Sequence, residues 1–342
     1  MKLVSFRIQT PVAYFVRVGA LQGQSVIDLN MAYARMIADQ REAQPYRLAN
    51  AAVPSTMLEL LEGGASAMAG ARQAFDYAVR LGNSVRGPEE ETVVYPYDSV
   101  RPNEGVRIIA PLPNPPSLRD FLAFEDHIAA TSKKRGQAIP PEWYKAPVYY
   151  KGNHRTIIGP EEDLPWPLET KKLDYELELA CVIGRKGKDI SEQQASDYIA
   201  GYTIMNDFSA RDVQFEEMAC RLGPAKGKDF ATAIGPSLVT PDEIPDLNAL
   251  IMIARVNGKT WSKGRFGTIH WSFPQMIAHV SRGEAIYPGD LFGSGTVGGG
   301  CGLEMDRYLN PGDVVELEIQ PIGVLKTRIV KRRRSDERQR DE

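Results

Sequence analysis

The spacing of apolar and polar residues predicts that the chain begins with a small sheet covered by helices. Residues 1–30 alternate between apolar and polar positions with glycines between them, which is typical of short antiparallel strands. From Ser55 to Leu81 the sequence is alanine-rich with helical spacing, and Ser55 or Thr56 can cap the first turn. We therefore expect helices at 55–81 that cover the amino-terminal sheet.

A run of prolines divides the chain. Residues 111–116 contain four prolines in six positions, which is too many for a helix or a central strand. We predict a linker here, between a small amino-terminal domain at 1–112 and a larger domain at 117–331. The remaining residues, 332–342, mix both charges densely and predict a frayed, solvated tail.

Beyond the linker the pattern is mostly that of β structure. Residues 117–130 have helical spacing, whereas 173–185 and 201–206 have the composition of strands. Short apolar segments broken by glycine predict further strands at 235–240, 250–256, 291–297, 313–319 and 323–331. The expected fold class is therefore α+β and mostly β.

Composition and charge exclude several classes of protein. The 342 residues are 43% hydrophobic and 25% charged, close to the averages of folded globular proteins. A net charge of −3 provides no field for a nucleic acid or a membrane surface, and no apolar run approaches the roughly 18 residues of a membrane span. The three cysteines, Cys181, Cys220 and Cys301, are too scattered for a disulfide framework. We expect a cytoplasmic protein.

Acidic residues near two predicted strands indicate a cation site. Asp174, Glu176 and Glu178 share one face of a strand, and on their own they favour a solvent-exposed face. Asp207 changes this interpretation, because it follows an apolar strand directly and a buried acid needs a partner. Carboxylates suit Mg²⁺, Ca²⁺ or Mn²⁺, and no histidine pair has the spacing of zinc ligands, so a zinc site is not expected.

The segment after the linker adds a histidine to these acids. Asp120 and His127 are seven residues apart, and on the predicted helix they project from the same side. A lone histidine is more often structural than catalytic. Residues 131–145 are basic and then aromatic, and could close over an anionic substrate as a lid or form an exposed basic loop.

A glycine-rich segment at 293–298 matches GxGxxG, the dinucleotide-binding pattern. That fingerprint requires a strand before it, a helix opening at it and an acid about 20 residues further on. Here more glycines follow, and then strands near the end of the chain. The sequence favours a flexible loop over a nucleotide site, with a substrate-lining role left open.

Taken together, these segments resemble the fumarylacetoacetate hydrolase family over residues 117–330. The motifs are Asp120-x6-His127, Tyr175 to Leu179, Gly201 to Gln214, Gly227 to Thr232, and Ser294-Gly295-Thr296. The resemblance implies a mixed β-roll catalytic domain with a smaller amino-terminal α+β domain, and a homodimer. It also implies a divalent cation, Mg²⁺ in preference to Mn²⁺ or Ca²⁺, held by Asp120, Glu176, Glu178 and Asp207.

The resemblance also implies an activity. In this family a histidine oriented by a glutamate activates water, which attacks a carbonyl of a β-diketo acid and splits a carbon–carbon bond. His127 matches the histidine, and Glu304 is the match for the glutamate. By the same resemblance Arg211, Gln214 and Lys228 would assist catalysis, Tyr150 and Thr296 would contact the substrate, and Lys228 and Thr232 would support the metal ligands. We expect a hydrolase of a small anionic diketo acid, an acylpyruvate or a compound like fumarylacetoacetate, in aromatic catabolism.

The chain departs from the family pattern at two positions. Decarboxylase-like members place the glutamate three residues after the histidine, where this chain has Ala130. The family hydrolase has a tyrosine where this chain has Leu122, so the substrate stays open. The same metal site could serve an isomerase, a hydratase or an oxaloacetate-type decarboxylase. A metal-stabilised binding protein is disfavoured by the joint presence of His127, Glu304 and Lys228.

Overall fold

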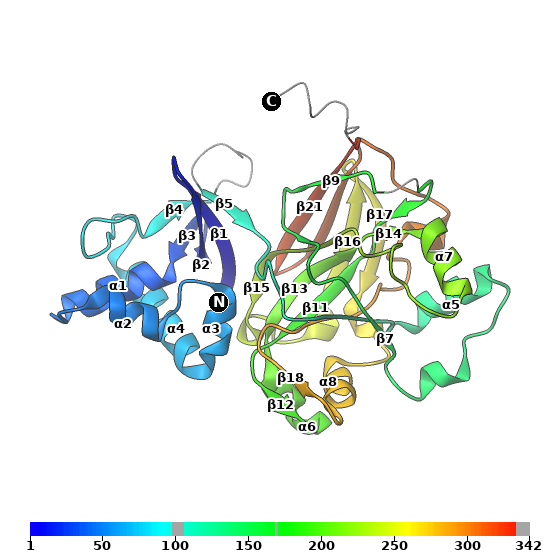
Figure 1. The fold of residues 1–342 in the computed structure, drawn as a ribbon, viewed down its shortest axis with the longest axis horizontal. Helices are drawn as coiled ribbons and strands as arrows, with labels where there is room; N and C mark the ends of the chain where they lie inside the picture. The colour runs from blue at the N-terminus through cyan, green and yellow to red at the C-terminus, as the bar shows by residue number, and fades with distance from the viewer. Residues whose placement is uncertain (98–105, 168–169, 333–342) are drawn as a thin grey trace.

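The computed structural model describes residues 1–97, 106–167 and 170–332, which form two lobes (Figure 1). Only the first residue of the predicted tail at 332–342 lies within the described part of the chain. The elements of the amino-terminal lobe are β1 (Lys2–Gln9), β2 (Tyr14–Gln22), β3 (Ser25–Asp28), α1 (Leu29–Asp39), α2 (Pro45–Ala52), α3 (Met57–Glu62), α4 (Gly64–Leu81), β4 (Val94–Pro96) and β5 (Val106–Ile109).

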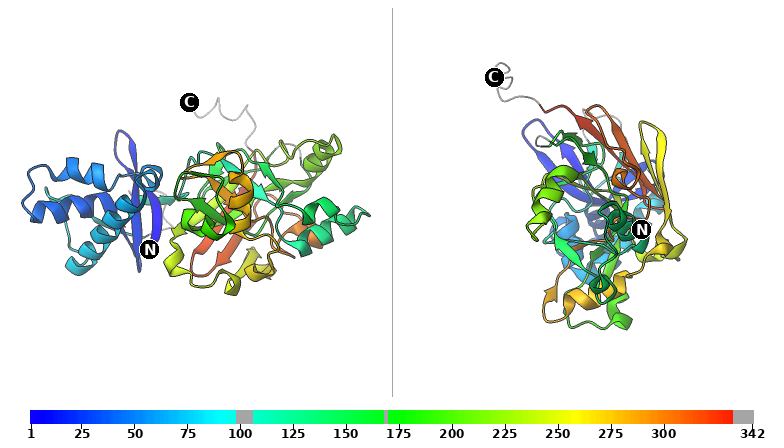
Figure 2. Two further views of the ribbon diagram at one scale, coloured as in Figure 1. Left: turned by 90° about the horizontal axis from the view of Figure 1, so that it is seen from below. Right: turned by 90° about the vertical axis from the view of Figure 1, so that its right-hand side faces the viewer.

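The amino-terminal lobe confirms the predicted strands at 1–30 and helices at 55–81. Its helices lie on the outer side of the strands, away from the second lobe (Figure 2). The longest, α4, buries Ala67, Ala71, Ala74 and Ala78. These residues recur every three or four positions, so their small side chains form one face that packs closely onto its neighbours.

The second lobe contains most of the strands. Its strands are β6 (Leu118–Phe121), β7 (Tyr149–Lys151), β8 (Ile157–Ile158), β9 (Asp163–Pro165), β10 (Leu173–Asp174), β11 (Glu178–Ile183), β12 (Gly187–Lys188), β13 (Ile199–Asp207), β14 (Ser209–Ala210), β15 (Thr232–Val239), β16 (Ile251–Val256), β17 (Lys259–Arg265), β18 (Ala285–Ile286), β19 (Leu291–Gly293), β20 (Val314–Ile319) and β21 (Gly323–Val330). Its α-helices are α5 (Glu125–Lys134), α6 (Glu192–Ala195), α7 (Arg211–Ala219), α8 (Phe273–Ser281) and α9 (Gly302–Met305). The five later predicted strands are therefore present, with the one at 291–297 shortened to β19.

A 12-stranded sheet runs through both lobes, because β1 pairs antiparallel with β15. A second sheet of five strands, in the order β17-β16-β20-β21-β9, packs beside it. The largest core cluster lies between them and includes Leu177, Ile204 and Leu317. The proline-rich residues 111–116 contain no helix or strand. The fold is α+β and mostly β, as predicted.

The predicted helix at 117–130 is wrong in its first half. Leu118–Phe121 forms strand β6, and the helix α5 begins only at Glu125. All four residues of β6 are buried, and the strand pairs with β19 on one side and β7 on the other. Pairing on both edges satisfies the backbone of these residues, so tertiary structure overrides their local helical spacing. Asp120 and His127 therefore do not share a helix.

The predicted strand at 173–185 is divided into β10 and β11. Between them Glu176 forms an isolated bridge with Cys301. Every residue of β11 is buried, because the sheet is covered on both faces. The solvent-exposed face that the three acids favour on their own is therefore wrong.

Among the described residues, no helix is long and apolar enough to cross a membrane.

Candidate active site

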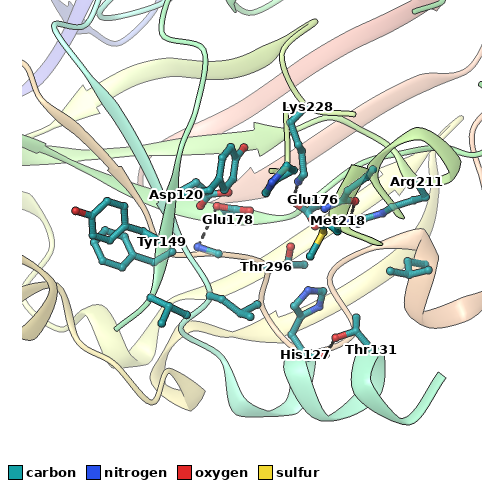
Figure 3. Close-up of a pocket in the computed structure, with 18 of the residues that line it drawn as sticks. Asp120, His127, Thr131, Tyr149, Glu176, Glu178, Arg211, Met218, Lys228 and Thr296 are labelled. Carbon is teal, nitrogen blue, oxygen red and sulfur yellow. Dashed lines mark hydrogen bonds and ion pairs between the residues drawn. The ribbon is translucent and has the colours of Figure 1, made fainter. Parts of the chain in front are cut away.

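A cavity of about 220 Å³ lies where β6, α5, α7 and the loop after β19 meet (Figure 3). Its polar wall includes Asp120, Glu176, Glu178, His127 and Lys228. Its apolar wall is formed by Phe121, Leu122, Val148, Phe215, Met218, Pro224 and Leu303. The lining of the cavity is therefore partly charged and partly apolar.

Three of the four predicted metal ligands form one tight group. Carboxylate oxygens of Asp120, Glu176 and Glu178 all lie within 4.8 Å of one another, and the three residues are buried. Asp120 reaches this position from β6, next to Gly293 and Tyr150 of the neighbouring strands. Glu178 begins β11, and its Oε2 accepts a hydrogen bond of 3.1 Å from the Gly295 backbone N–H.

Two carboxylate oxygens of this group have no hydrogen-bond partner in the part of the chain that the structure describes. Within the described residues, Asp120 Oδ1 and Glu178 Oε1 are buried and accept no hydrogen bond. Burial, together with repulsion from neighbouring carboxylates, raises the pKa of Asp120 and of Glu178 well above the usual values. Buried oxygens without partners are costly, and a hard dication bound between them would remove the cost. The all-oxygen donor set fits Mg²⁺, Mn²⁺ or Ca²⁺.

The fourth predicted ligand, Asp207, lies beside this group at the end of β13. Its carboxylate accepts hydrogen bonds from the Tyr150 hydroxyl and from Thr232 Oγ1, the latter at 3.1 Å. Lys228 Nζ lies 2.6 Å from Asp207 Oδ2 and 2.5 Å from Glu176 Oε2. Thr232 and Lys228 thus contact the predicted ligand set, and their supporting role stays a prediction. Tyr150 contacts Asp207 and also lines the cavity.

Glu176 differs from Asp120 and Glu178 in its electrostatic surroundings. Burial acts to raise its pKa, but the nearby cations Lys228 and Arg211 outweigh burial and lower it below the usual range. Arg211 Nη2 donates to Glu176 Oε1 at 2.8 Å, and Arg211 Nη1 donates to Gln214 Oε1 at 3.1 Å. Both Arg211 and Gln214 line the cavity. Glu176 is therefore held ionised and in a fixed orientation.

His127 and Glu304 meet although 177 residues separate them along the chain: the His127 Nδ1 to Glu304 Oε1 distance is 2.8 Å. Oε2 of Glu304 accepts a hydrogen bond from the Gly299 N–H at 2.9 Å. His127 projects from α5 toward the carboxylate group and Thr296 (Figure 3). Glu125, an acid in the first turn of the same helix, instead accepts a hydrogen bond from the Tyr144 hydroxyl.

The glycine-rich loop after β19 contacts both Glu178 and Glu304 through its backbone N–H groups. Gly295 has φ +77°, and a Cβ there would lie 2.2 Å from the Phe121 carbonyl oxygen. Only glycine fits this position, and its N–H thereby reaches Glu178. Thr296 is buried beside it, lines the cavity and has an Oγ1 with no hydrogen-bond partner within the described residues. In the described part of the chain the helix that follows is α9, which has only four residues and is therefore not of the dinucleotide-binding type. The loop lines the cavity, and its substrate-lining role stays a prediction.

Asp174 is not part of the group of carboxylates that faces the cavity. Its two oxygens accept hydrogen bonds from the backbone N–H groups of Gly302 and Leu303, at 2.7 and 2.9 Å. Oδ2 also accepts from Arg211 Nε at 2.8 Å. The break in the strand at 175–177 allows this divergence. Asp174 thus fixes the segment that carries Glu304, a role that spacing alone did not indicate.

Replacing Asp174 by alanine should destabilise the fold. Arg211 would lose a buried partner and two backbone N–H groups would lose their acceptor, so we expect a loss of about 3–5 kcal/mol in the free energy of unfolding. Urea denaturation measures this. Glu192→Ala, an exposed change, is the control and should stay within about 0.5 kcal/mol of the parent. Equal stability of both variants would contradict the assigned role.

The segment 131–145, suggested as a lid, is anchored in part. Trp143 is buried, and its Nε1 donates a 2.6 Å hydrogen bond to the Leu122 carbonyl oxygen. Thr131 and Arg135 line the cavity. The lid stays a prediction.

Sequence reasoning missed two further features of the site. Cys301 is buried, and its Sγ lies 3.6 Å from Glu304 Oε1. Phe215 and Met218 of α7 are both partly exposed at the cavity. Their spacing of three residues places them on one face of α7, a helix that the sequence analysis did not predict. Cys301 lies only three residues before Glu304, but its closeness to His127 and Glu176 has no local signal, because those residues come from distant segments.

Comparisons with known proteins identify the family of the chain. The family model described as "Fumarylacetoacetate (FAA) hydrolase C-terminal" matches residues 117–330. The oxaloacetate tautomerase YisK of Bacillus subtilis (strain 168) is 31% identical over 297 residues, which cover 86% of this chain and 92% of that protein. The human mitochondrial oxaloacetate tautomerase FAHD2A is 30% identical over 280 residues, 81% of each protein.

A solved structure shares the fold. The maleylpyruvate hydrolase of Sphingobium sp. SYK-6, in complex with manganese(II) ion and pyruvate, superposes with a TM-score of 0.67 at 19% identity, covering 97% of this chain and 100% of that chain. The family model over residues 117–330 and the relatives at 30% and 31% identity establish the family. This chain belongs to the fumarylacetoacetate hydrolase family.

Proposed function

We propose that this protein is a divalent-metal-dependent hydrolase that cleaves a carbon–carbon bond of a β-diketo acid such as an acylpyruvate. The observation that carries the proposal is the His127–Glu304 pair, at 2.8 Å, which faces the buried carboxylates across one cavity. A base next to a cation site is the arrangement that hydrolysis of a carbonyl compound needs.

His127 supplies the base in this proposal. With Glu304 accepting the hydrogen on Nδ1, the imidazole keeps Nε2 unprotonated, and that atom can take a proton from water. Glu304 also stabilises the imidazolium that results. The activated water forms a bond to the acyl carbonyl carbon, the adjacent carbon–carbon bond breaks, and its electron pair leaves on the enolate of pyruvate, which is then protonated.

The charged residues of the cavity would bind the cation and orient its ligands. Asp120, Glu176 and Glu178, with Asp207 beside them, would hold a divalent cation, which when bound supplies polarisation of the substrate's oxygens. Lys228 and Arg211 fix the orientation of Glu176. The manganese(II) ion and pyruvate in the maleylpyruvate hydrolase support a cation of this class here.

Thr296 is suited to contact the substrate. Its Oγ1 is buried and has no hydrogen-bond partner within the described residues, so a substrate oxygen in the cavity would satisfy it. The apolar lining residues, among them Leu122 and Met218, suit the acyl end of the substrate. The carboxylate and keto oxygens would then lie at the charged lining residues.

Keto–enol tautomerisation of oxaloacetate is the second candidate, favoured by the names of the two relatives at 30% and 31% identity. His127 could carry a proton between a carbon and an oxygen of the same substrate. No water would be consumed and no carbon–carbon bond would break.

Turnover in ¹⁸O-labelled water separates the two reactions. Hydrolysis of an acylpyruvate should release acid and pyruvate in equal amounts, with at least one labelled oxygen in the acid, because the attacking oxygen ends there. Mass spectrometry of the products measures this. Interconversion of enol and keto oxaloacetate without release of any acid from a panel of acylpyruvates would instead establish the tautomerase.

A further inference from the structure

The structure assembles a second set of metal-binding groups next to the carboxylates. His127, Cys301 and Glu304 each offer one ligand atom, and these atoms lie within 4.8 Å of one another. His127 Nδ1 and Cys301 Sγ lie 2.8 and 3.6 Å from the same oxygen, Glu304 Oε1. The sequence analysis considered only histidine pairs at zinc spacing. It could not detect this set, because the three residues come from α5, the glycine loop and α9.

We propose that His127, Cys301 and Glu304 form an inhibitory site for a soft divalent metal such as Zn²⁺. Nitrogen, sulfur and oxygen donors at these separations match the ligand types of zinc. The all-oxygen group of Asp120, Glu176 and Glu178 prefers hard cations, so the two sites differ in metal preference.

Charged groups of both signs lie near the thiol of the site. The carboxylates of Asp174, Glu176 and Glu304 act on Cys301 electrostatically, and the Arg211 guanidinium opposes them. Cys301 also forms a backbone bridge with Glu176. His127 lines the cavity, so a metal ion can reach the site by the route open to the substrate. Burial of the thiol and of both other side chains, each below 9% exposed, protects the bound ion from competing water.

Binding there would disable the base. The metal takes Nδ1 of His127 and Oε1 of Glu304, and the thiol proton is released to solvent on binding to sulfur. The proton formerly on Nδ1 moves to Nε2, which can then no longer accept a proton from water. This inhibition rests on the proposed role of His127, whereas the metal site itself does not.

The test begins with spectroscopy and needs no substrate. Protein saturated with Mg²⁺ is titrated with Co²⁺, a probe that reports thiolate ligation by a sulfur-to-cobalt charge-transfer band in the near ultraviolet. The band should appear in the parent protein, persist in Cys220→Ser, whose cysteine is exposed, and vanish in Cys301→Ser. Glu178→Gln, which alters only the all-oxygen group, should keep the band. No band in the parent, or an unchanged band in Cys301→Ser, would overturn the site.

A kinetic measurement tests the inhibition. Zinc inhibition is expressed relative to each variant's own zinc-free rate, in the presence of saturating Mg²⁺. Cys301→Ser should weaken inhibition by more than about 100-fold, since loss of an outer partner alone costs a metal site 10–100-fold. Cys220→Ser should be inhibited as the parent is. Equal inhibition of Cys301→Ser and the parent would place zinc at the carboxylates and refute the proposal. If no substrate is turned over, only the proposed function fails, because the cobalt band is independent of it.

Discussion

Replacing Glu178 by glutamine should abolish turnover by removing divalent-cation binding. Glu178 is fully buried, and its Oε1 has no partner within the described residues, so a bound cation is the group that would satisfy it. The amide keeps the size of the side chain but loses the charge. Calorimetric titration with Mn²⁺ should show binding in the parent protein and none in the variant, and chelation of the parent should have the same effect on activity, with Mg²⁺ or Mn²⁺ restoring it.

Stability provides an independent readout of the same change. A ligand that binds only the folded state raises Tm, so Mn²⁺ should raise the Tm of the parent and not that of Glu178→Gln. Glu161→Gln, on the surface and paired with Lys326, is the matched control and should behave as the parent does. Unchanged Mn²⁺ affinity in both Glu178→Gln and Glu176→Ala would exclude the carboxylate group as the metal site.

The second large effect is expected at the base. His127→Ala should lower kcat by about 10² to 10⁴, the usual contribution of a positioned general base, while the protein stays folded and Mn²⁺ affinity stays close to that of the parent. Glu304→Gln should cause a smaller loss of the same kind, because the amide oxygen can still accept from Nδ1 but carries no charge to stabilise the imidazolium.

His154→Gln provides the matched control for the histidine. His154 Nδ1 lies 2.8 Å from the Pro115 carbonyl oxygen, and the residue does not line the cavity. Its replacement should leave kcat close to that of the parent. Full turnover in His127→Ala, on a substrate that the parent cleaves, would show that another group acts as the base.

The residues of the site were identifiable from the sequence because they occur in ordered motifs. Asp120, His127 and Thr296 all line one cavity, and Glu304, which the family resemblance matched to the glutamate, lies next to His127. Their chemical roles stay predictions. The grouping of His127, Cys301 and Glu304 could not be identified from the sequence, because Cys301 lies in no motif that pairs it with His127.

Local pattern alone determined the strands at 1–30, the helices at 55–81 and most later strands, because alternation and helical spacing are properties of neighbouring residues. Tertiary structure decided what covers each face. Asp120 lies on a strand because β19 and β7 pair with it, and Glu178 is buried because the sheet is covered on both faces. Asp174 turns away from Glu178 because the backbone N–H groups at the start of α9 need its carboxylate. Apolar periodicity records which residues avoid water, whereas the partners of a buried polar group come from segments far away in the chain.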